Sequence, residues 1–242
     1  MTIETRQITV SGIKVEVVRK DIKNLHLGVY PPHGRVRVAA PLVVNDEAVR
    51  LAVIDKLGWI KRQRARFAEQ PRQSPREMVN GESHFFLGRR CRLRMHEQEG
   101  PARVVRCGLK CLDLYVKPDT NAQQREAILL RWYREQLKVL IPPLLEKWQP
   151  TLGAQVTGWG IRKMKTKWGS CNADAGRIWL NLELAKKPVQ CLEYIVVHEL
   201  VHLLERHHND RFTAIMDTFM PSWRYHRDEL NRSTLGYEKW TY

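Results

Sequence analysis

The sequence predicts an α+β protein: a β-rich amino-terminal half, residues 1–117, followed by a helical domain with a short sheet, residues 118–242. Two observations predict this class. Apolar and polar residues alternate through much of the first half, which is the period of half-buried strands. After residue 121, long segments repeat their apolar residues every three or four positions, which is the period of a helix. With 242 residues, 43% of them hydrophobic, the chain is long and apolar enough for one large domain or two modest ones.

Short strands account for the first forty residues. A tight turn at Ser11-Gly12 joins two alternating runs, and a turn at residues 31–34 precedes a further strand. Asn45 or Asp46 is typical of a helix N-cap, so we expect one long helix over about residues 46–67. The polar residues 69–75 include two prolines and are the best candidate for a linker.

Strand-like segments continue from Phe85 to Val116, and a long helix should then begin near Asn121. Pro142-Pro143 should kink or restart this helix, because proline lacks the backbone N–H that a helix interior needs. No internal repeat is evident in the sequence.

The last third of the chain should hold a short sheet and three helices. Alternating apolar residues predict a strand at 178–182, and Pro188 suits the first turn of the next helix. Asn209 can cap a helix that ends near Phe219, and a final helix should span residues 222–232.

The composition limits the class of partner. Lysine and arginine number 41 against 26 acidic residues, a formal charge of +15. Such an excess attracts polyanions, so nucleic acid, nucleotides and acidic proteins are candidate partners, although dispersed charge is also typical of a solvated surface. No apolar run approaches the roughly 18 residues of a membrane span, and residues 1–6 do not resemble a secretory signal. We therefore expect a cytoplasmic protein without a membrane partner, with its five scattered cysteines reduced.

The segment His198-Glu199-Leu200-Val201-His202 carries the strongest chemical signal. Residues four apart lie on one face of a helix, so both imidazoles can contact one ion. Neutral imidazole is a good ligand for Zn²⁺, and an adjacent carboxylate can take a proton from a metal-activated water. This H-E-x-x-H pattern predicts a zinc hydrolase with Glu199 as its base.

A catalytic zinc needs a third protein ligand. His207 and His208 follow closely, and the chain can reverse between the histidine helix and the helix that Asn209 caps. His226 and Glu229 are the more distant options. Spacing favours the adjacent pair without separating its two members.

A dense cationic run lies upstream of the histidines, at residues 162–168. Arg162, Lys165 and Lys167 could sit at the edge of the metal cleft and hold an anionic group or a developing oxyanion, or they could simply be solvated. Trp168 could line the cleft or cover the core. Asn181 alternates with two leucines and could orient a ligand or cap an edge strand.

The combination of segments resembles a known family. Trp168-Gly169-Ser170-Cys171, the histidine motif with its preceding Tyr194-Ile195-Val196-Val197, and His208-Asn209-x-x-Phe212 resemble the YgjP-like family, a bacterial group related to the SprT and WLM metallopeptidases among the zincins. The resemblance implies a zincin-like catalytic domain in residues 118–242 with zinc bound by His198, His202 and His208. It also implies that Glu199 is the catalytic base and that the tryptophan–cysteine segment lies against the cleft.

Three functions follow from these observations. The first is a zinc-dependent peptidase, in which an edge strand near residues 178–182 could align an extended peptide. The second is a metal-dependent pyrophosphohydrolase of nucleoside triphosphates such as UTP, with the cationic run on the phosphates. The third is a DNA-associated protease of SprT type, whose basic surface would bind nucleic acid.

Overall fold

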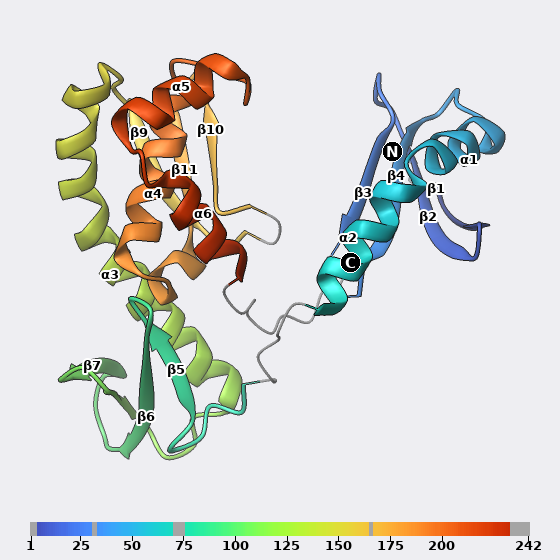
Figure 1. The fold of residues 1–242 in the computed structure, drawn as a ribbon. Helices are drawn as coiled ribbons and strands as arrows, with labels where there is room; N and C mark the ends of the chain where they lie inside the picture. Colours follow the sequence, from blue (N-terminus) through green and yellow to red (C-terminus); the bar gives the residue numbers. More distant parts are fainter. Residues whose placement is uncertain (1–3, 31–32, 70–75, 165–166, 233–242) are drawn as a thin grey trace. The chain divides into compact units, whose positions relative to one another are not determined.

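The computed structural model describes residues 4–30, 33–69, 76–164 and 167–232 (Figure 1). These residues form three sheets, six α-helices and one 3-10 helix, so the predicted mixed α+β class is confirmed. The chain divides into two compact units, Met1–Pro71 and Arg72–Tyr242. The expected boundary at 117/118 instead falls inside the second unit. Of the expected linker, residues 70–75 lie outside the described residues.

The first unit is a four-stranded sheet with two helices. Its strands are β1 (Glu4–Val10), β2 (Ile13–Lys20), β3 (His26–Tyr30) and β4 (Arg35–Pro41), in the order β1-β2-β4-β3. Strands β2 and β4 are parallel, and the other two pairs are antiparallel. Valines of β2 and β4 form the core with Val49, Val53 and Ile60 of the helices.

The expected single helix over residues 46–67 is two helices, α1 (Asp46–Asp55) and α2 (Leu57–Glu69). Lys56 separates them, because its ψ of 8° leaves the helical region. The break lets α1 contact β1 while α2 contacts β3. Strands β1 and β3 are the two opposite edges of the sheet. A single straight helix would not contact both edges equally well.

The second unit begins with a sheet of the same design. Its strands are β5 (Ser83–Phe86), β6 (Arg89–Glu97), β7 (Arg103–Cys107) and β8 (Cys111–Val116), in the order β5-β6-β8-β7. Again the second and fourth strands are parallel and the other pairs antiparallel. The helix α3 (Ala122–Leu152) follows, and the Tyr133 hydroxyl on α3 donates a 2.7 Å hydrogen bond to the Phe85 carbonyl.

The two sheets are therefore a structural repeat. Their first hairpins turn through Ser11-Gly12 and Leu87-Gly88, and in both turns φ is 47° and then 76°. The helix that follows each sheet is N-capped by an asparagine, Asn45 or Asn121, with φ −77° and ψ 168° in both cases. The sequence does not show this repeat, because it lies in the strand order and in the turn conformations. Only a few residue identities determine these features.

Helix α3 continues through Pro142-Pro143, where we expected a kink or a restart. It runs for 31 residues, from a capping box between Asn121 and Gln124 to a left-handed Gly153. One buried stripe spans the prolines: Leu137, Ile141, Leu145 and Trp148. Packing along this stripe holds the helix together where backbone hydrogen bonds are missing.

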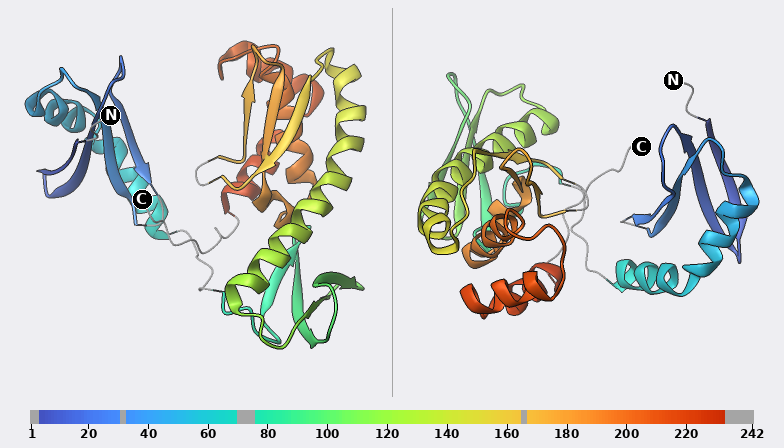
Figure 2. Two further views of the ribbon diagram at one scale, coloured as in Figure 1. Left: turned by 180° about the vertical axis from the view of Figure 1, so that it is seen from behind. Right: turned by 90° about the horizontal axis from the view of Figure 1, so that it is seen from above.

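The last part of the second unit surrounds a small sheet, β9 (Gly158–Arg162), β10 (Gly169–Asn172) and β11 (Arg177–Asn181), in the order β10-β11-β9. The segment expected to be an edge strand is thus the central one, and β10 is an edge. The 3-10 helix η1 (Leu182–Lys186) leads into α4 (Val189–Val201), which is followed by α5 (Asp210–Phe219) and α6 (Trp223–Arg232). Figure 2 shows these helices gathered beside the small sheet.

The tip of the β5–β6 hairpin is docked on the start of α4. The backbone N–H groups of Leu87 and Gly88 donate to the carbonyls of Ala185 and Lys186, at 2.9 and 3.2 Å. A Cβ on Gly88 would lie 2.8 Å from Cγ of Pro188, the N-cap of α4. The equivalent Gly12 in the first unit has no neighbour within 4 Å of such a Cβ.

None of the helices in the described part of the chain combines the length and the apolar character needed to span a membrane.

Replacing Gly88 with alanine should destabilise its unit more than replacing Gly12 destabilises the first unit. Both alanines would carry about 1–2 kcal/mol of left-handed backbone strain. Only at position 88 does overpacking against Pro188 add about 1–3 kcal/mol to the loss in the free energy of unfolding. Urea titrations followed by circular dichroism measure both losses. Equal losses would show that the hairpin tip is not closely packed on Pro188.

Candidate metal centre

Helix α4 carries the histidine motif into the interior of the second unit. Of its 13 residues, nine are buried: Cys191, Leu192, Tyr194, Ile195, Val196, Val197, Glu199, Leu200 and Val201. It contacts the small sheet, η1 and the helices α3, α5 and α6. A helix enclosed in this way is apolar on nearly every side, so its polar residues are the exceptions that need a reason.

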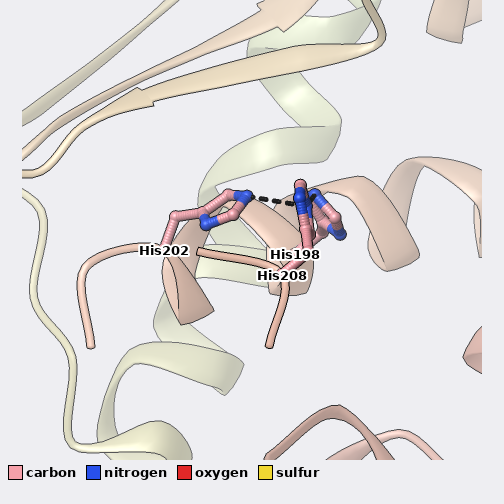
Figure 3. A group of neighbouring side chains, drawn as sticks. All are labelled: His198, His202 and His208. Carbon is pink, nitrogen blue, oxygen red and sulfur yellow. Dashed lines mark hydrogen bonds between the residues drawn. The ribbon is translucent and has the colours of Figure 1, made fainter. Parts of the chain in front are cut away.

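The imidazoles of three histidines meet at one point. Nε2 of His208 lies 3.1 Å from Nε2 of His202 and 3.1 Å from Nε2 of His198 (Figure 3). His198 is on α4, His202 is its C-cap, and His208 comes from the connection to α5. Of the adjacent pair, His208 is therefore the one whose ring nitrogen lies with those of His198 and His202, all within 4.8 Å of one another.

The protonation states of the rings suit metal binding. Burial, followed by the neighbouring His202 and His208, lowers the pKa of His198 to about 3, and burial also lowers the pKa of His202. Both rings are therefore neutral at pH 7. Nδ1 of His202 lies 3.1 Å from the Glu205 carbonyl and can donate to it, which leaves Nε2 with its lone pair directed to the cluster.

Two of the three nitrogen–nitrogen separations also suit a tetrahedral ion. Imidazole nitrogens that bind zinc at 2.0–2.1 Å lie roughly 3.3 Å from one another. The observed 3.1 Å separations are close to that value. Three imidazole nitrogens that converge in this way cannot all satisfy one another by hydrogen bonds, so the donor set matches a cation better than it matches a packed core.

Phe212 forms the wall behind the three imidazoles. Its ring centroid lies 5.0, 4.8 and 4.8 Å from those of His198, His202 and His208. It sits in the first turn of α5, where its backbone N–H donates to the Asn209 side chain that caps the helix. One buried aromatic ring therefore restricts the orientation of all three ligands.

The other candidates for the third ligand lie elsewhere. The His207 side chain is exposed, and its backbone N–H donates to the Glu205 carboxylate. His226 is within 3.2 Å of the Ser222 hydroxyl, and Glu229 accepts from the Cys191 thiol at 3.3 Å.

Glu199 is a buried carboxyl group beside the histidines, 4% exposed. Burial raises its pKa to about 8, an effect that Lys167 partly opposes. Its Oε2 has no hydrogen-bond partner among the described residues. On its other side is Gly169 of β10, where a Cβ would lie 2.4 Å from Oε1 of Glu199. Glycine is thus the residue that lets the strand approach this carboxyl group.

An open pocket of about 700 Å³ exposes the histidines and Glu199. The edge strand β10 and its flanking residues, from Lys167 to Asp174, line it on one side. Tyr194 of α4 and Arg227, Leu230 and Asn231 of α6 contribute further lining. Cys171 lies in this wall, and burial followed by the charge of Glu199 raises the pKa of its thiol to about 11, so it is a neutral thiol.

The structure brings only some of the predicted substrate residues to this pocket. Lys167 and Trp168 line it. Arg162 instead lies over the Trp179 ring, with its guanidinium carbon 3.4 Å from the centroid. Lys165 lies outside the described residues.

Asn181 is not among the pocket-lining residues that the structure describes, because its amide binds the backbone instead. It donates to the carbonyls of Met164 and Lys167, at 2.9 and 2.7 Å, and it accepts from the N–H of Glu183 at 3.1 Å. Asn181 therefore anchors the cationic loop to the end of β11, and its part in the site is to position Lys167 and Trp168.

The residues that sequence reasoning did not assign to the site are Phe212 as a wall, Gly169 as a spacer, and Arg206, Arg227 and Asn231 as pocket lining. Phe212 could have been suspected from its place three residues after an N-cap that follows a ligand candidate. The residues of α6 give no local signal, because only the tertiary fold brings them to the pocket.

Comparison with known proteins places this geometry in a family. A crystal structure of the metallopeptidase zymogen of Pyrococcus abyssi abylysin is similar at 24% identity and a TM-score of 0.34, over 38% of this chain and 97% of that one. No curated protein sequence matches the chain. The model of the YgjP-like metallopeptidase domain matches residues 23–233, which include most of both units and all of the metal centre. The chain therefore belongs to the YgjP-like metallopeptidase family.

Proposed function

We propose that the chain is a zinc-dependent peptidase in which Glu199 is the general base. The observation that carries the proposal is the convergence of three imidazole nitrogens beside a buried carboxyl group, at the wall of an open pocket. The family match supports a metallopeptidase. The identity of the metal, the role of Glu199 as base and the peptide substrate are what we propose.

Zinc is the metal that this donor set favours. Three neutral imidazoles with an open fourth position are a common catalytic zinc site, whereas magnesium and calcium prefer oxygen ligands. Zinc held by His198, His202 and His208 would lower the pKa of a water molecule to about 7 and polarise a carbonyl group.

Glu199 is placed to move the proton. It is adjacent to His198, and its Oε2 is not engaged by the described protein groups. A carboxylate there can accept a proton from the attacking water and deliver it to the leaving nitrogen. Gly169 allows the carboxyl group this position, because a Cβ on that residue would lie 2.4 Å from Oε1 of Glu199.

The edge strand β10 is the proposed guide for the substrate. An extended peptide can add to an exposed strand edge through backbone hydrogen bonds, and β10 both forms an edge of its sheet and lines the pocket. The sequence suggested this role for the segment near residues 178–182, but β11 is the central strand of its sheet. The proposed role therefore passes to the neighbouring strand β10.

A second candidate function is pyrophosphohydrolysis of a nucleoside triphosphate such as UTP. Three cationic side chains line the pocket, those of Lys167, Arg206 and Arg227, and they could hold phosphate oxygens. The group of described residues that could hold a metal consists of three histidines, whereas carboxylates usually bind the magnesium of nucleotide enzymes. Peptide hydrolysis is therefore the preferred function.

Replacing Glu199 with glutamine should reduce peptide hydrolysis by about 10²–10⁴-fold, the usual contribution of a general base. Zinc content measured by mass spectrometry should stay unchanged, because the imidazoles remain. The matched control is Glu193→Gln, on the same helix, where the carboxylate binds Lys147 and Trp148. Turnover of a quenched peptide library by zinc-loaded protein gives the rate. Full activity of the Glu199 variant would refute the assignment.

The same protein samples, incubated with nucleoside triphosphates and assayed for pyrophosphate, separate the two candidate functions. Glu199-dependent release of pyrophosphate without peptide cleavage would replace the peptidase by the nucleotide enzyme.

Replacing His208 with alanine should abolish stoichiometric zinc binding, because two ligands remain where three converged. His207→Ala, one position away, should bind zinc like the wild type, since the His207 side chain is exposed and the hydrogen bond of this residue to Glu205 comes from its backbone N–H. Titration with zinc against a competing chromophoric chelator measures both affinities. A loss of zinc affinity in the His207 variant, with none in the His208 variant, would instead assign His207 as the third ligand.

Replacing Gly169 with alanine should lower kcat by about 100-fold while zinc remains bound, because the new Cβ would displace the Glu199 carboxyl group. Gly158→Ala on β9 is the control, since its Cβ would meet only the Arg177 side chain at 3.8 Å, an ordinary contact. Steady-state kinetics with matched zinc content compare the two variants. An unchanged kcat at position 169 would show that the carboxyl position does not limit the reaction.

A further inference from the structure

The outer face of the β5–β8 sheet carries a group of basic residues that the metal centre does not use. Along β6, Cys91 and Leu93 are buried, and the alternate residues Arg90, Arg92, Arg94 and His96 are exposed. Arg103 of β7 joins them, because it pairs with Tyr115 of β8, which in turn pairs with His96. We call Arg90, Arg92, Arg94, His96 and Arg103 the arginine face.

The charge on this face is strongly unbalanced. Among the residues of the four strands, all of which the structure describes, Asp113 is the only carboxylate in register with the arginine face. Arg94 binds it with two hydrogen bonds of 2.6 and 2.8 Å, and His96 lies 3.2 Å away. The hydrogen bonds from Arg94 hold the pKa of Asp113 below its usual range, so Asp113 is ionised and offsets one guanidinium of four.

The planar groups of the face are held in place. The His96 ring stacks on Tyr115, with centroids 4.8 Å apart and planes at 19°. The guanidinium of Arg103 lies 4.4 Å from the Tyr115 centroid, and Nε of Arg90 donates to the Ser83 hydroxyl at 2.7 Å. The sheet itself is fixed by α3 on its other face. A ligand therefore meets cations whose directions are already set, which reduces the entropy lost on binding.

The face lacks the exposed apolar core of a protein interface. Such interfaces have an apolar core, rich in aromatic side chains that the partner buries. Of the large apolar residues on the described strands β5–β8, Val105 is the exposed one, at 43%. Recognition here must therefore depend on charge and on planar stacking, which favours phosphate groups and bases.

We propose that the arginine face binds single-stranded nucleic acid without sequence preference. Alternate residues of a strand repeat about every 6.8 Å, so Arg90 and Arg92 form a row along β6. With Arg103 they are the three guanidinium groups of the face whose charge Asp113 does not offset, and they can bind an extended phosphate backbone. Bases can stack on guanidinium and imidazole planes. A four-stranded sheet is too wide for a duplex groove, which admits a helix or a two-stranded ribbon. The proposal does not depend on the hydrolase activity.

The test is fluorescence anisotropy of a labelled oligothymidylate of about 16 nucleotides, titrated with the full chain at several salt concentrations. Three phosphate contacts predict a slope of log affinity against log salt of about −2, since each contact on a single strand contributes about −0.7. The double variant Arg92→Glu, Arg103→Glu should bind about tenfold or more weakly at low salt, with a slope nearer −0.7. Arg94 is left intact because its ion pair with Asp113 also supports the sheet.

The matched control is Arg50→Glu, Arg131→Glu, which changes the net charge equally at two exposed helical positions. It should keep the wild-type affinity within about twofold. Thermal melts show which variants are folded. If the two glutamates prevent folding, the double variant with glutamine at the same positions, Arg92→Gln and Arg103→Gln, replaces it. Three results would each overturn the proposal: no binding by the wild type at low salt, an equal loss in the control, or equally effective competition by a duplex or by polyglutamate.

Discussion

Burial of one helix among apolar neighbours is the constraint on which the metal centre depends. Helix α4 places two imidazoles and a carboxyl group in a region where charge is poorly solvated. The same burial therefore lowers the pKa of His198 and raises that of Glu199. An uncompensated buried carboxyl group is costly. The protein tolerates this cost because the rest of α4 contributes eight buried residues to the core.

The β5–β8 sheet is more than an appendage to this core. Its hairpin tip binds the carbonyls of η1 and packs on the N-cap of α4, while α3 contacts both the sheet and α4. The start of the histidine helix is thus fixed from two directions. The end is fixed by Phe212 and by the Glu205 carbonyl, which orient the rings at the point where the helix stops.

Features that depend on residues close together in the chain could be predicted from the sequence, and features that depend on contacts between distant segments could not. The Ser11-Gly12 turn, the caps at Asn45, Asn121 and Asn209, and the spacing of His198 and His202 all depend on residues within a few positions of one another. The break at Lys56, the central place of β11 and the backbone role of Asn181 depend on partners far along the chain. The choice of His208 over His207 as the proposed third ligand needed the three-dimensional path of the loop, since the two residues have the same chemistry and differ in the direction of their side chains.

The repeat of one strand order in two sheets also bears on how the chain acquires its fold. Every ladder contact of the first sheet joins residues between Glu4 and Pro41, and every one of the second joins residues between Ser83 and Val116. Two sheets with matching hairpins could exchange strands if they formed together, a common route to misassembly in repetitive chains. Synthesis on the ribosome separates them in time, because the first set of strands has emerged in full before the second begins. The order of translation thereby keeps the strands of one sheet from pairing with the similar strands of the other.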